Sequence, residues 1–362
     1  MDAIFFNSAY CLLIFFFCIG LLKSIQTKNS HKHKISVIIA ARNEEQNLPH
    51  LLEILFDQSY PDELYEVVVA DDRSQDGTSA VVKKFQKSHS NLKLVKIEKE
   101  NPDLVGKKGA LTAAISVSSN EILAFTDADS LPTRFWLEEI NAHFTPETDF
   151  IAGYTFIKMK NRFWELLKNL ERSALFAVIA GAFGWKWGLT CGAANMAYRR
   201  ELFDSVNGFE GIGHIRSGDD DLMLHKMAKK IRRMRFMFSQ NSIVDSQGTK
   251  NAREQVQQET RRASKWKYYP LSIKLLTFFV FVYYLVFITA LAAAIINHLG
   301  LSSFLLFLAM KVISEFLLVF TFLIKIKKIH LMSVFPLAEL IYIPYYIFFG
   351  LKGTFGRYRW KD

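Results

Sequence analysis

The chain has 362 residues, of which 50% are hydrophobic and 32 are Phe, so it could hold one domain of roughly 250 residues together with membrane helices. Its formal charge of +10 fits a protein that lies at an anionic membrane surface and handles phosphates, whereas no recognition helix or RNA-binding motif supports a nucleic-acid partner. The three cysteines, Cys11, Cys18 and Cys191, support neither a disulfide framework nor a cysteine metal site.

An uncharged segment close to the N-terminus is long enough to cross a membrane. Residues 3–22 could span a hydrocarbon core of ~30 Å, and the chain lacks the basic start that a cleaved signal peptide would have. Residues 1–23 are therefore expected to be an uncleaved anchor. Four lysines follow: Lys23, Lys28, Lys32 and Lys34. Because basic flanks stay inside, we expect the next domain to lie in the cytoplasm, in an integral protein of a bacterial-type inner membrane.

Residues 34–269 are expected to form an α/β domain with a mostly parallel sheet, because short β-rich runs alternate with helical stretches. The predicted strands are residues 35–40, 66–71, 92–97 and 122–127, and the predicted helices between them are residues 47–57, 78–87 and 107–118. Ligands gather at the carboxyl ends of strands in such sheets. Polar residues follow three of the strands: Arg42-Asn43-Glu44, Asp71-Asp72-Arg73-Ser74 and Asp127-Ala128-Asp129. We therefore expect a ligand site at this edge of the sheet.

Asp127 and Asp129 could together hold a hard divalent cation. They follow a buried apolar strand, and residues two apart in an extended chain point the same way. Mg²⁺ and Mn²⁺ prefer oxygen ligands and often share them with phosphates, so a bound cation could neutralise the charge on a departing diphosphate. The alternative is an ordinary acidic triplet in a loop.

Two further segments could bind a nucleotide diphosphate. Asp71 and Asp72 could hydrogen-bond a base or a ribose, although an Asp or Ser here could instead cap the next helix. Lys107 and Lys108 follow Gly106 at the start of a predicted helix, where a lysine and the helix N-terminus can both face a phosphate.

Three adjacent carboxylates, of Asp219, Asp220 and Asp221, begin another predicted helix. Their mutual repulsion is costly unless a cation or a function compensates for it, and crowding suits a group that must take a proton from a hydroxyl. Helix capping is the competing interpretation, and one aspartate could cap while another acts as a base.

A polar segment precedes the next apolar span and contains Gln258, Arg261 and Arg262. Guanidinium groups present paired donors to phosphate oxygens, so they could clamp a diphosphate. A basic patch that contacts anionic lipids is the alternative. Residues 163–182 form another apolar helical stretch, which could lie against the membrane or in the domain core.

Residues 270–351 are expected to form two to three C-terminal membrane helices. Within the second apolar span, Lys311 and Glu315 share a helix face and could pair between helices or line a polar groove. Residues 332–351 are apolar but contain two prolines and Glu339, and a basic tail of residues 352–362 follows. A re-entrant or interfacial last segment would leave both of its basic flanks inside.

Taken together, these motifs resemble the family 2 glycosyltransferases, specifically the membrane-bound branch related to cellulose, chitin and hyaluronan synthases. The matching pieces span most of residues 35–266 and are Val37-Ile38-Ile39-Ala40-Ala41-Arg42-Asn43-Glu44, Asp71-Asp72-Arg73-Ser74, Gly106-Lys107, Asp127-Ala128-Asp129, Cys191-Gly192-Ala193-Ala194-Asn195 with Arg199-Arg200, Gly218-Asp219-Asp220-Asp221-Leu222, and Gln258 with Arg261-Arg262.

The resemblance implies a GT-A fold and an inverting transfer, dependent on Mg²⁺ or Mn²⁺, from a UDP- or GDP-sugar to a lipid-linked or polysaccharide acceptor, as in cell-envelope glycolipid or polysaccharide synthesis. It assigns the metal to Asp127 and Asp129 and the general base to Asp219. Donor binding falls to a larger set: Ala40, Arg42, Glu44, Asp71, Asp72, Lys107, Asp127, Gln258, Arg261 and Arg262.

Two positions depart from the family pattern. Gly218 replaces the glutamate that usually precedes the catalytic aspartate, so Asp220 could be the base instead of Asp219. Arg262 stands where the synthases have a tryptophan that helps to hold the acceptor. Transfer of one or a few sugars is therefore expected rather than processive synthesis.

Two other functions compete with transfer. A haloacid-dehalogenase-type phosphohydrolase would share the Asp-x-Asp of Asp127 and Asp129, but that class has Thr or Val where Leu131 stands, and it leaves Asp71 and Asp72 unexplained. A non-catalytic membrane scaffold that binds nucleotide would not need carboxylates at all three acidic sites.

Overall fold

The structure is a computed structural model that describes residues 2–24, 29–249, 251–297 and 300–356. Its packing divides the chain into two compact units, which are described separately. The α/β unit consists of the described parts of Ser24–Lys158 and of Lys186–Gln247. The helical unit consists of the N-terminal helix, Met159–Trp185 and the described residues from Gly248 onward.

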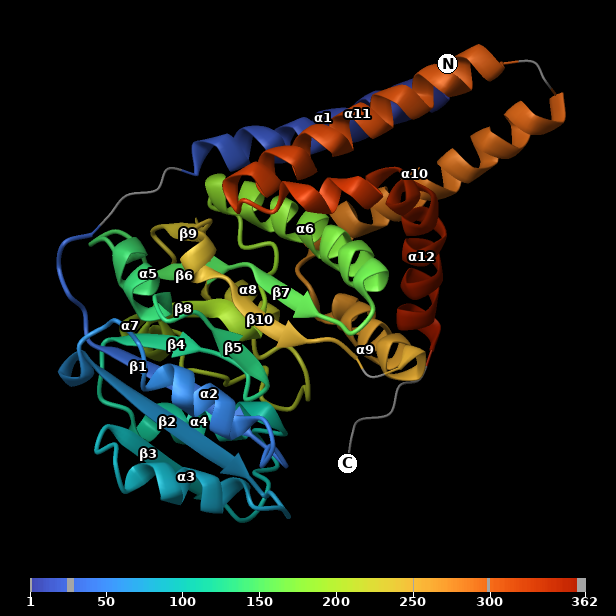
Figure 1. The fold of residues 1–362 in the computed structure, drawn as a ribbon. Helices are drawn as coiled ribbons and strands as arrows, with labels where there is room; N and C mark the ends of the chain where they lie inside the picture. Colours follow the sequence, from blue (N-terminus) through green and yellow to red (C-terminus); the bar gives the residue numbers. More distant parts are fainter. Residues whose placement is uncertain (1, 25–28, 250, 298–299, 357–362) are drawn as a thin grey trace. The chain divides into compact units, whose positions relative to one another are not determined.

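A seven-stranded sheet forms the centre of the α/β unit, with strand order β3-β2-β1-β4-β8-β6-β9 (Figure 1). The four strands that come first in the chain are parallel, β8 is antiparallel to both of its neighbours, and β9 is parallel to β6. The prediction of a mostly parallel sheet is confirmed. The strands are β1 (Ile35–Ala41), β2 (Tyr65–Asp72), β3 (Leu92–Ile97), β4 (Ile122–Phe125), β6 (Phe150–Gly153), β8 (Met196–Arg199) and β9 (Met234–Met237).

A smaller sheet has the order β5-β10-β7, with β10 antiparallel to β5 and parallel to β7. Its strands are β5 (Ser130–Pro132), β7 (Thr155–Lys158) and β10 (Val244–Gln247). Because β5 begins directly after Asp129, this sheet borders the acidic segment that follows β4. The predicted metal-binding segment, Asp127 to Asp129, thus connects a strand of the large sheet to a strand of the small sheet.

Helices cover the large sheet because apolar residues recur on one face of each. On α2, Leu48, Leu51, Leu52 and Leu55 are all fully buried and belong to the same core cluster as residues of β1 and β2. The helices of this unit are α2 (Leu48–Leu55), α3 (Thr78–Gln86), α4 (Lys107–Val117), α5 (Trp136–His143), α7 (Arg200–Ser205) and α8 (Asp221–Met227), with 3₁₀ turns η1 (Asp62–Leu64), η2 (Ala193–Asn195) and η3 (Gln240–Ser242).

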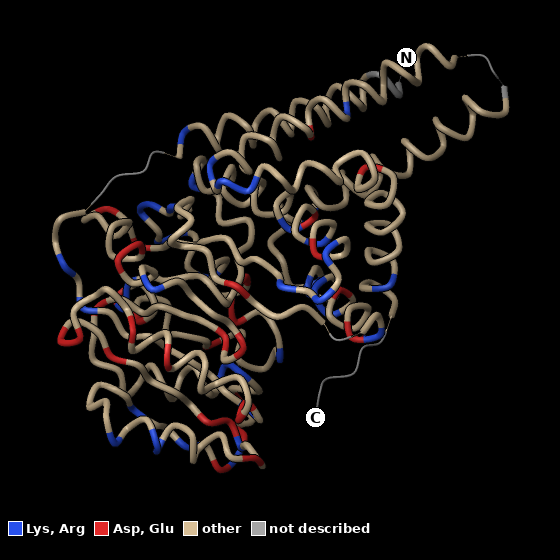
Figure 2. The backbone as a smooth tube through the Cα atoms, viewed as in Figure 1, with Lys and Arg blue, Asp and Glu red and all other residues tan. Residues whose placement is uncertain are grey.

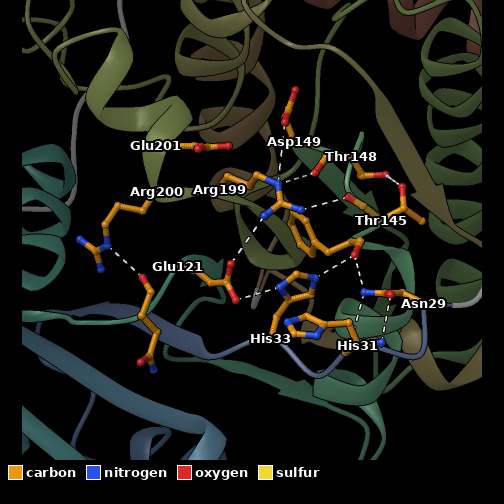
Figure 3. Close-up of polar contacts among 12 residues, drawn as sticks. Asn29, His31, His33, Glu121, Thr145, Thr148, Asp149, Arg199, Arg200 and Glu201 are labelled. Atoms are coloured by element: carbon orange, nitrogen blue, oxygen red, sulfur yellow. Dashed lines mark hydrogen bonds and ion pairs between the residues drawn. The ribbon is translucent and has the colours of Figure 1, made fainter.

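The segment before β1 is fastened to the α/β unit around His33 (Figure 3). Its Nδ1 lies 2.8 Å from Glu121 Oε1 and its Nε2 lies 3.0 Å from the Phe144 carbonyl oxygen, while Glu121 also lies 3.7 Å from Arg199. His31, His33 and Glu121 have potential metal-ligating atoms within 4.8 Å of one another. Because both ring nitrogens of His33 already have partners, we interpret this group as a structural clasp.

Among its described residues, the helical unit has four helices that are long and apolar enough to cross a membrane: Phe5–Lys23, Leu271–Ile296, Leu301–Lys325 and Ile329–Phe355. Much of their length carries no charged residue (Figure 2). The count of one N-terminal and three C-terminal candidates agrees with the prediction. The elements are α1 (Asp2–Lys23), α6 (Arg162–Gly184), α9 (Ala252–Ser264), α10 (Leu271–Asn297), α11 (Leu301–Lys325) and α12 (Phe335–Phe355), with η4 (Lys265–Tyr268) and η5 (Ile329–Val334).

The predicted basic tail lies mostly outside the described residues. Lys352 belongs to the last turn of α12, whereas residues 357–362 are not described. Lys28, one of the four lysines expected to orient the anchor, is also not described.

The apolar stretch of residues 163–182 forms most of α6, which packs on the membrane helix α1. The two helices approach closely at glycines: a Cβ built on Gly20 would lie 2.0 Å from the carbonyl oxygen of Gly181. Trp185, just after α6, donates its indole N–H to the Phe16 carbonyl at 2.8 Å. Small residues allow such backbone contact between helices.

Lys311 is buried between the membrane helices, as one of the two interpretations of its sequence predicted. Its ammonium lies 2.9 Å from Glu315 on the same helix and 2.5 Å from Glu339 on α12, and the Tyr10 hydroxyl donates to Glu315 at 2.6 Å. With only 2% of its side chain exposed, Lys311 lines no open groove.

Candidate active site

Lys107 connects two of the predicted acidic segments. Gly106 has φ +62°, a left-handed conformation that favours glycine, and it starts α4 so that Lys107 is the first helical residue. The Lys107 ammonium donates to Asp127 and lies 3.3 Å from Asp219 Oδ2. Burial opposes the charged form of Lys107, but Asp127 and Asp219 outweigh it and raise its pKa above the ordinary value. The cation therefore stays charged between two carboxylates.

Asp127 and Asp129 lie in a turn, so the expectation that they extend strand β4 is wrong. The strand ends at Phe125, and the Ser130 N–H donates to the Asp127 carbonyl at 3.0 Å. The two carboxylates nevertheless repel each other: burial, then Asp127 and Glu44, raise the pKa of Asp129 to about 6. A divalent cation would relieve this repulsion, so the oxygen donor set fits Mg²⁺ or Mn²⁺.

The acidic run at residues 219–221 divides its tasks between neighbouring aspartates. Asp220 is the N-cap residue of α8, and its side chain accepts a hydrogen bond from the Asp221 N–H at 2.8 Å. Asp219 Oδ2 is buried and, among the described residues, accepts no hydrogen bond, with the Lys107 ammonium as its cationic neighbour. Asp220 thus caps the helix, whereas Asp219 lies near Lys107 and contributes its carboxylate to the cluster with Asp127.

Gly218 has a structural reason to depart from the family's glutamate. Its φ is +81°, in the left-handed region where a side chain is strained, and a Cβ there would lie 2.5 Å from Leu222 Cγ. The sequence shows the departure, but only the backbone shows why glycine suits this position.

The segment after β2 folds back on itself. Asp71 accepts hydrogen bonds from the Ser74 N–H at 3.0 Å and from the Ser79 hydroxyl, while Asp72 pairs with Arg73 at 2.8 Å. Gly77, the N-cap residue of α3, offers no side chain, but Asp76 accepts a hydrogen bond from the Thr78 N–H at 3.0 Å, so an Asp of this segment does cap the helix. Asp71 instead stabilises the turn that leads into it.

Glu100 joins two of the motifs and also contacts Arg216, although no pattern in the sequence around Glu100 indicates a role. It accepts a hydrogen bond from the Gly106 N–H at 2.9 Å and lies 3.3 Å from Arg73 and 3.8 Å from Arg216. The hydrogen bond from the Gly106 N–H and, to a lesser extent, the charges of Arg73 and Arg216 lower the pKa of Glu100 below its ordinary value. Burial acts in the opposite direction but is outweighed. No motif surrounds Glu100, so only the folded contacts identify it.

The residues at the end of β1 lie at the same edge of the sheet as those that end β2 and follow β4. Ala40 is a partly buried strand residue and Arg42 is exposed. The Glu44 N–H donates to the Thr78 hydroxyl at 2.9 Å, and the Glu44 carboxylate is close enough to Asp129 to raise its pKa.

Gln258, Arg261 and Arg262 lie on α9 in the helical unit and are not among the residues that the α/β unit brings together. Arg262 lies 3.1 Å from Glu259, which also pairs with Lys168 at 2.9 Å. Burial opposes ionisation of Glu259, but Arg262 and Lys168 outweigh it and lower its pKa. The arginine in the tryptophan position thus has a carboxylate partner.

Residues 36–206 match the sequence model of the glycosyl transferase family 2. This match, over just under half of the 362 residues, confirms the resemblance of the motifs to this family. Among similar proteins, glycosyltransferase AglE of Haloferax volcanii is 40% identical over 104 residues, which are 29% of this chain and 33% of AglE. A beta-monoglucosyldiacylglycerol synthase of Trichormus variabilis is 33% identical over 96 residues, 26% of this chain and 20% of the synthase. The matched parts thus span a third or less of these curated relatives.

A solved structure has the same fold over nearly its whole length. The mannosyltransferase PcManGT from Pyrobaculum calidifontis, in complex with GDP-Man and Mn²⁺, aligns over 97% of both chains with a TM-score of 0.64 and 18% sequence identity. The predicted GT-A fold with accompanying apolar helices is confirmed.

Proposed function

We propose that this protein is a membrane-bound, metal-assisted, inverting glycosyltransferase. It moves a sugar from a UDP- or GDP-linked donor to a lipid-linked or polysaccharide acceptor at the cytoplasmic face of the membrane. The observation that supports this most directly is the position of Lys107 between Asp127 and Asp219. A cation that suits donor phosphates and a carboxylate that can take a proton thus lie in one cluster.

The acceptor hydroxyl oxygen attacks the anomeric carbon of the donor while the bond from that carbon to the diphosphate breaks. Attack from the face opposite the leaving group inverts the configuration. Asp219 Oδ2, buried and without a hydrogen-bond donor among the described residues, accepts the hydroxyl proton. Lys107 faces the negative charge of the diphosphate. Asp127 and Asp129 would hold Mg²⁺ or Mn²⁺, which would neutralise charge on the leaving diphosphate.

The four apolar helices found among the described residues support this class of acceptor. A membrane enzyme meets lipid-borne acceptors, and one relative is named for a glycolipid product, glucosyldiacylglycerol. PcManGT, with the same fold, was solved with GDP-Man and Mn²⁺, in keeping with a nucleotide donor and a divalent cation here. Arg262, engaged by Glu259, fits transfer of one or a few sugars.

Turnover of a panel of UDP- and GDP-sugars by the full-length protein with Mn²⁺ tests the proposal. Asp219→Asn should lower transfer by roughly 100-fold to 10,000-fold while donor affinity stays near the wild-type value, because a base acts on the acceptor. Asp220→Asn is the matched control, since it disturbs the cap of α8 and should lower the rate far less. Asp129→Ala should weaken both donor and metal binding.

Each competing function has its own signature in these measurements. Equal loss of donor binding in Asp219→Asn would refute its role as base. Nucleotide binding without turnover of any donor would favour the scaffold, and a phosphatase activity that needs no nucleotide would favour the phosphohydrolase.

A further inference from the structure

Lys108, the neighbour of Lys107 on α4, has its charge buried among backbone carbonyls. Its side chain is fully buried, and its ammonium donates to the carbonyl oxygens of Ile212 at 2.7 Å, Ile215 at 2.7 Å and Ser217 at 2.9 Å. A buried ammonium is costly unless hydrogen bonds replace its hydration shell, and bonds from a charged donor are among the strongest in proteins. The surrounding backbone is therefore organised about this cation.

The three carbonyls belong to the loop between α7 and α8, residues 208–218, which we call the glycine loop. It consists of turns and bends and contains left-handed glycines, Gly208 at φ +50°, Gly211 at +79° and Gly218 at +81°. Buried carbonyls outside sheets and helices need other donors. Lys108 donates to three carbonyls of the loop, of which that of Ile212 also accepts from the Ile215 N–H at 3.2 Å.

The anchored end of the glycine loop leads directly to the proposed base. Ser217, whose carbonyl accepts from Lys108, stands two residues before Asp219, and Asp219 in turn lies 3.3 Å from the Lys107 ammonium. Two consecutive lysines at the start of one helix thus act on the same short segment. Lys107 contacts the carboxylate, and Lys108 contacts the backbone that carries it.

The geometry leads us to propose that Lys108 is a positioning residue for the transfer reaction, which it serves by holding the glycine loop so that Asp219 stays opposite Lys107. This inference rests on the proposed function, because the place of Asp219 affects the rate only if Asp219 takes the acceptor's proton. Lys108 itself, enclosed by backbone, meets neither donor nor acceptor.

Lys108→Met tests the proposal, because methionine keeps the length and apolar stem of the side chain but removes its donors. A shift of a catalytic group by about 1 Å can lower a rate on the order of 100-fold, so kcat should fall by roughly 10-fold to 100-fold. Donor affinity should stay within about twofold, because the proposed donor contacts of Lys107, Asp127 and Asp129 remain.

Lys226→Met is the matched control. Lys226 also donates to carbonyls of the glycine loop, those of Gly208 at 2.7 Å and Glu210 at 2.6 Å, but at the end remote from Asp219. If the rate depends only on the end of the loop that Lys108 holds, next to Asp219, the Lys226→Met variant should keep kcat within about threefold of the wild type. Equal losses in the two variants would mean that loop stability in general, and not the placement of Asp219, governs the rate.

Hydrogen exchange of the loop separates this inference from the proposed function. In Lys108→Met, amides of residues 212–219 should exchange faster, whether or not the protein turns over a donor. Lys108→Gln, which is milder and keeps two donors, should give intermediate exchange and an intermediate kcat if the methionine variant does not fold. Unchanged exchange or unchanged kcat in a folded variant overturns the inference. If Lys108→Met exchanges faster but the wild-type protein turns over no donor, the proposed function is overturned, while the contact between Lys108 and the loop stands.

Discussion

One ammonium group and three carboxylates carry the chemistry of the proposed site at the scale of single residues. Lys107 contacts Asp127 and Asp219. The Asp127 carboxylate lies close enough to Asp129 to raise the pKa of Asp129. The cluster therefore has more negative than positive charge when all of its members are ionised. Such an arrangement accepts a divalent cation readily and, once a cation is bound, can attract a diphosphate.

The raised pKa of Asp129 predicts a pH dependence of metal binding. Burial, with Asp127 and Glu44, raises this pKa to about 6, so the folded protein holds the proton more tightly than the unfolded chain. Stability from this group is complete below the unfolded pKa of about 4 and is lost as pH rises through about 6. A cation must displace the same proton, so Mn²⁺ affinity should rise about tenfold per pH unit below this value.

Calorimetric titration with Mn²⁺ between pH ~5 and ~7.5 measures this dependence. Asp129→Asn should bind Mn²⁺ more weakly and lose most of the dependence on pH. Asp127→Asn removes a ligand and also a carboxylate that repels Asp129. The Mn²⁺ affinity of this variant should fall, and the pH at which Asp129 loses its proton should be lower. A wild-type affinity that stays constant across this range would contradict the assignment of Asp129 as a ligand.

At the scale of elements, hydrophobic patterning predicted more of the structure than of the site. The strands at residues 35–40, 66–71 and 92–97 were found within a residue or so, because apolar runs bounded by polar segments identify buried parallel strands. The predicted strand at residues 122–127 was too long, because the turn closed by Ser130 and Asp127 depends on backbone hydrogen bonding that composition does not reveal.

Contacts between distant segments explain the part of the site that could not be predicted. Asp127, Asp219 and Lys107 were each identified from motifs, but the salt bridges that unite them join residues up to 112 positions apart in the chain. Glu100 and Arg216 stand in no motif, and only the fold brings them to Gly106 and Arg73. Sequence patterns report local structure, whereas these pairs depend on how the elements pack.

The crossing of α1 and α6 yields a prediction about packing between elements. A Cβ on Gly184 would lie 1.9 Å from the Gly20 carbonyl oxygen, so backbone would have to move to admit one. Gly184→Val should destabilise the helical unit by about 1–3 kcal/mol or more, because overpacking forces the helices apart. Thermal unfolding of the full-length protein in detergent measures the change as a lower midpoint.

Ile19→Val serves as the control for this substitution. Ile19 precedes Gly20 on α1, but it is 49% exposed. Its replacement should leave the midpoint nearly unchanged. A Gly184→Val protein as stable as the wild type would show that α1 and α6 do not depend on this close approach.

At the scale of the whole molecule, the contacts of α12 bear on how the chain meets the membrane. The Glu339 carboxylate contacts Lys311 in the middle of α11, the Tyr346 hydroxyl donates to the carbonyl of Thr277 near the start of α10 at 3.4 Å, and a Cβ on Gly353 would lie 2.3 Å from Ala263 of the polar helix α9. Successive turns of α12 thus approach the segment that precedes α10 (Figure 1). Although α12 is long enough to cross a membrane, these contacts favour a last segment whose two ends lie on one side.

Labelling of single cysteines from the two sides of the membrane tests this topology, after replacement of the three native cysteines. Ser90, Ser302 and Thr354 are exposed and mark the α/β unit, the start of α11 and the end of α12. With the α/β unit in the cytoplasm, an impermeant maleimide should label Ser90→Cys and Thr354→Cys only in inverted vesicles, and Ser302→Cys only in right-side-out vesicles, because α10 alone separates Ser302 from the cytoplasm. Labelling of Thr354→Cys together with Ser302→Cys would mean that α12 crosses the membrane. Labelling of Ser90→Cys from outside would overturn the cytoplasmic location of the proposed active site, since the donor pool would then lie on the other side.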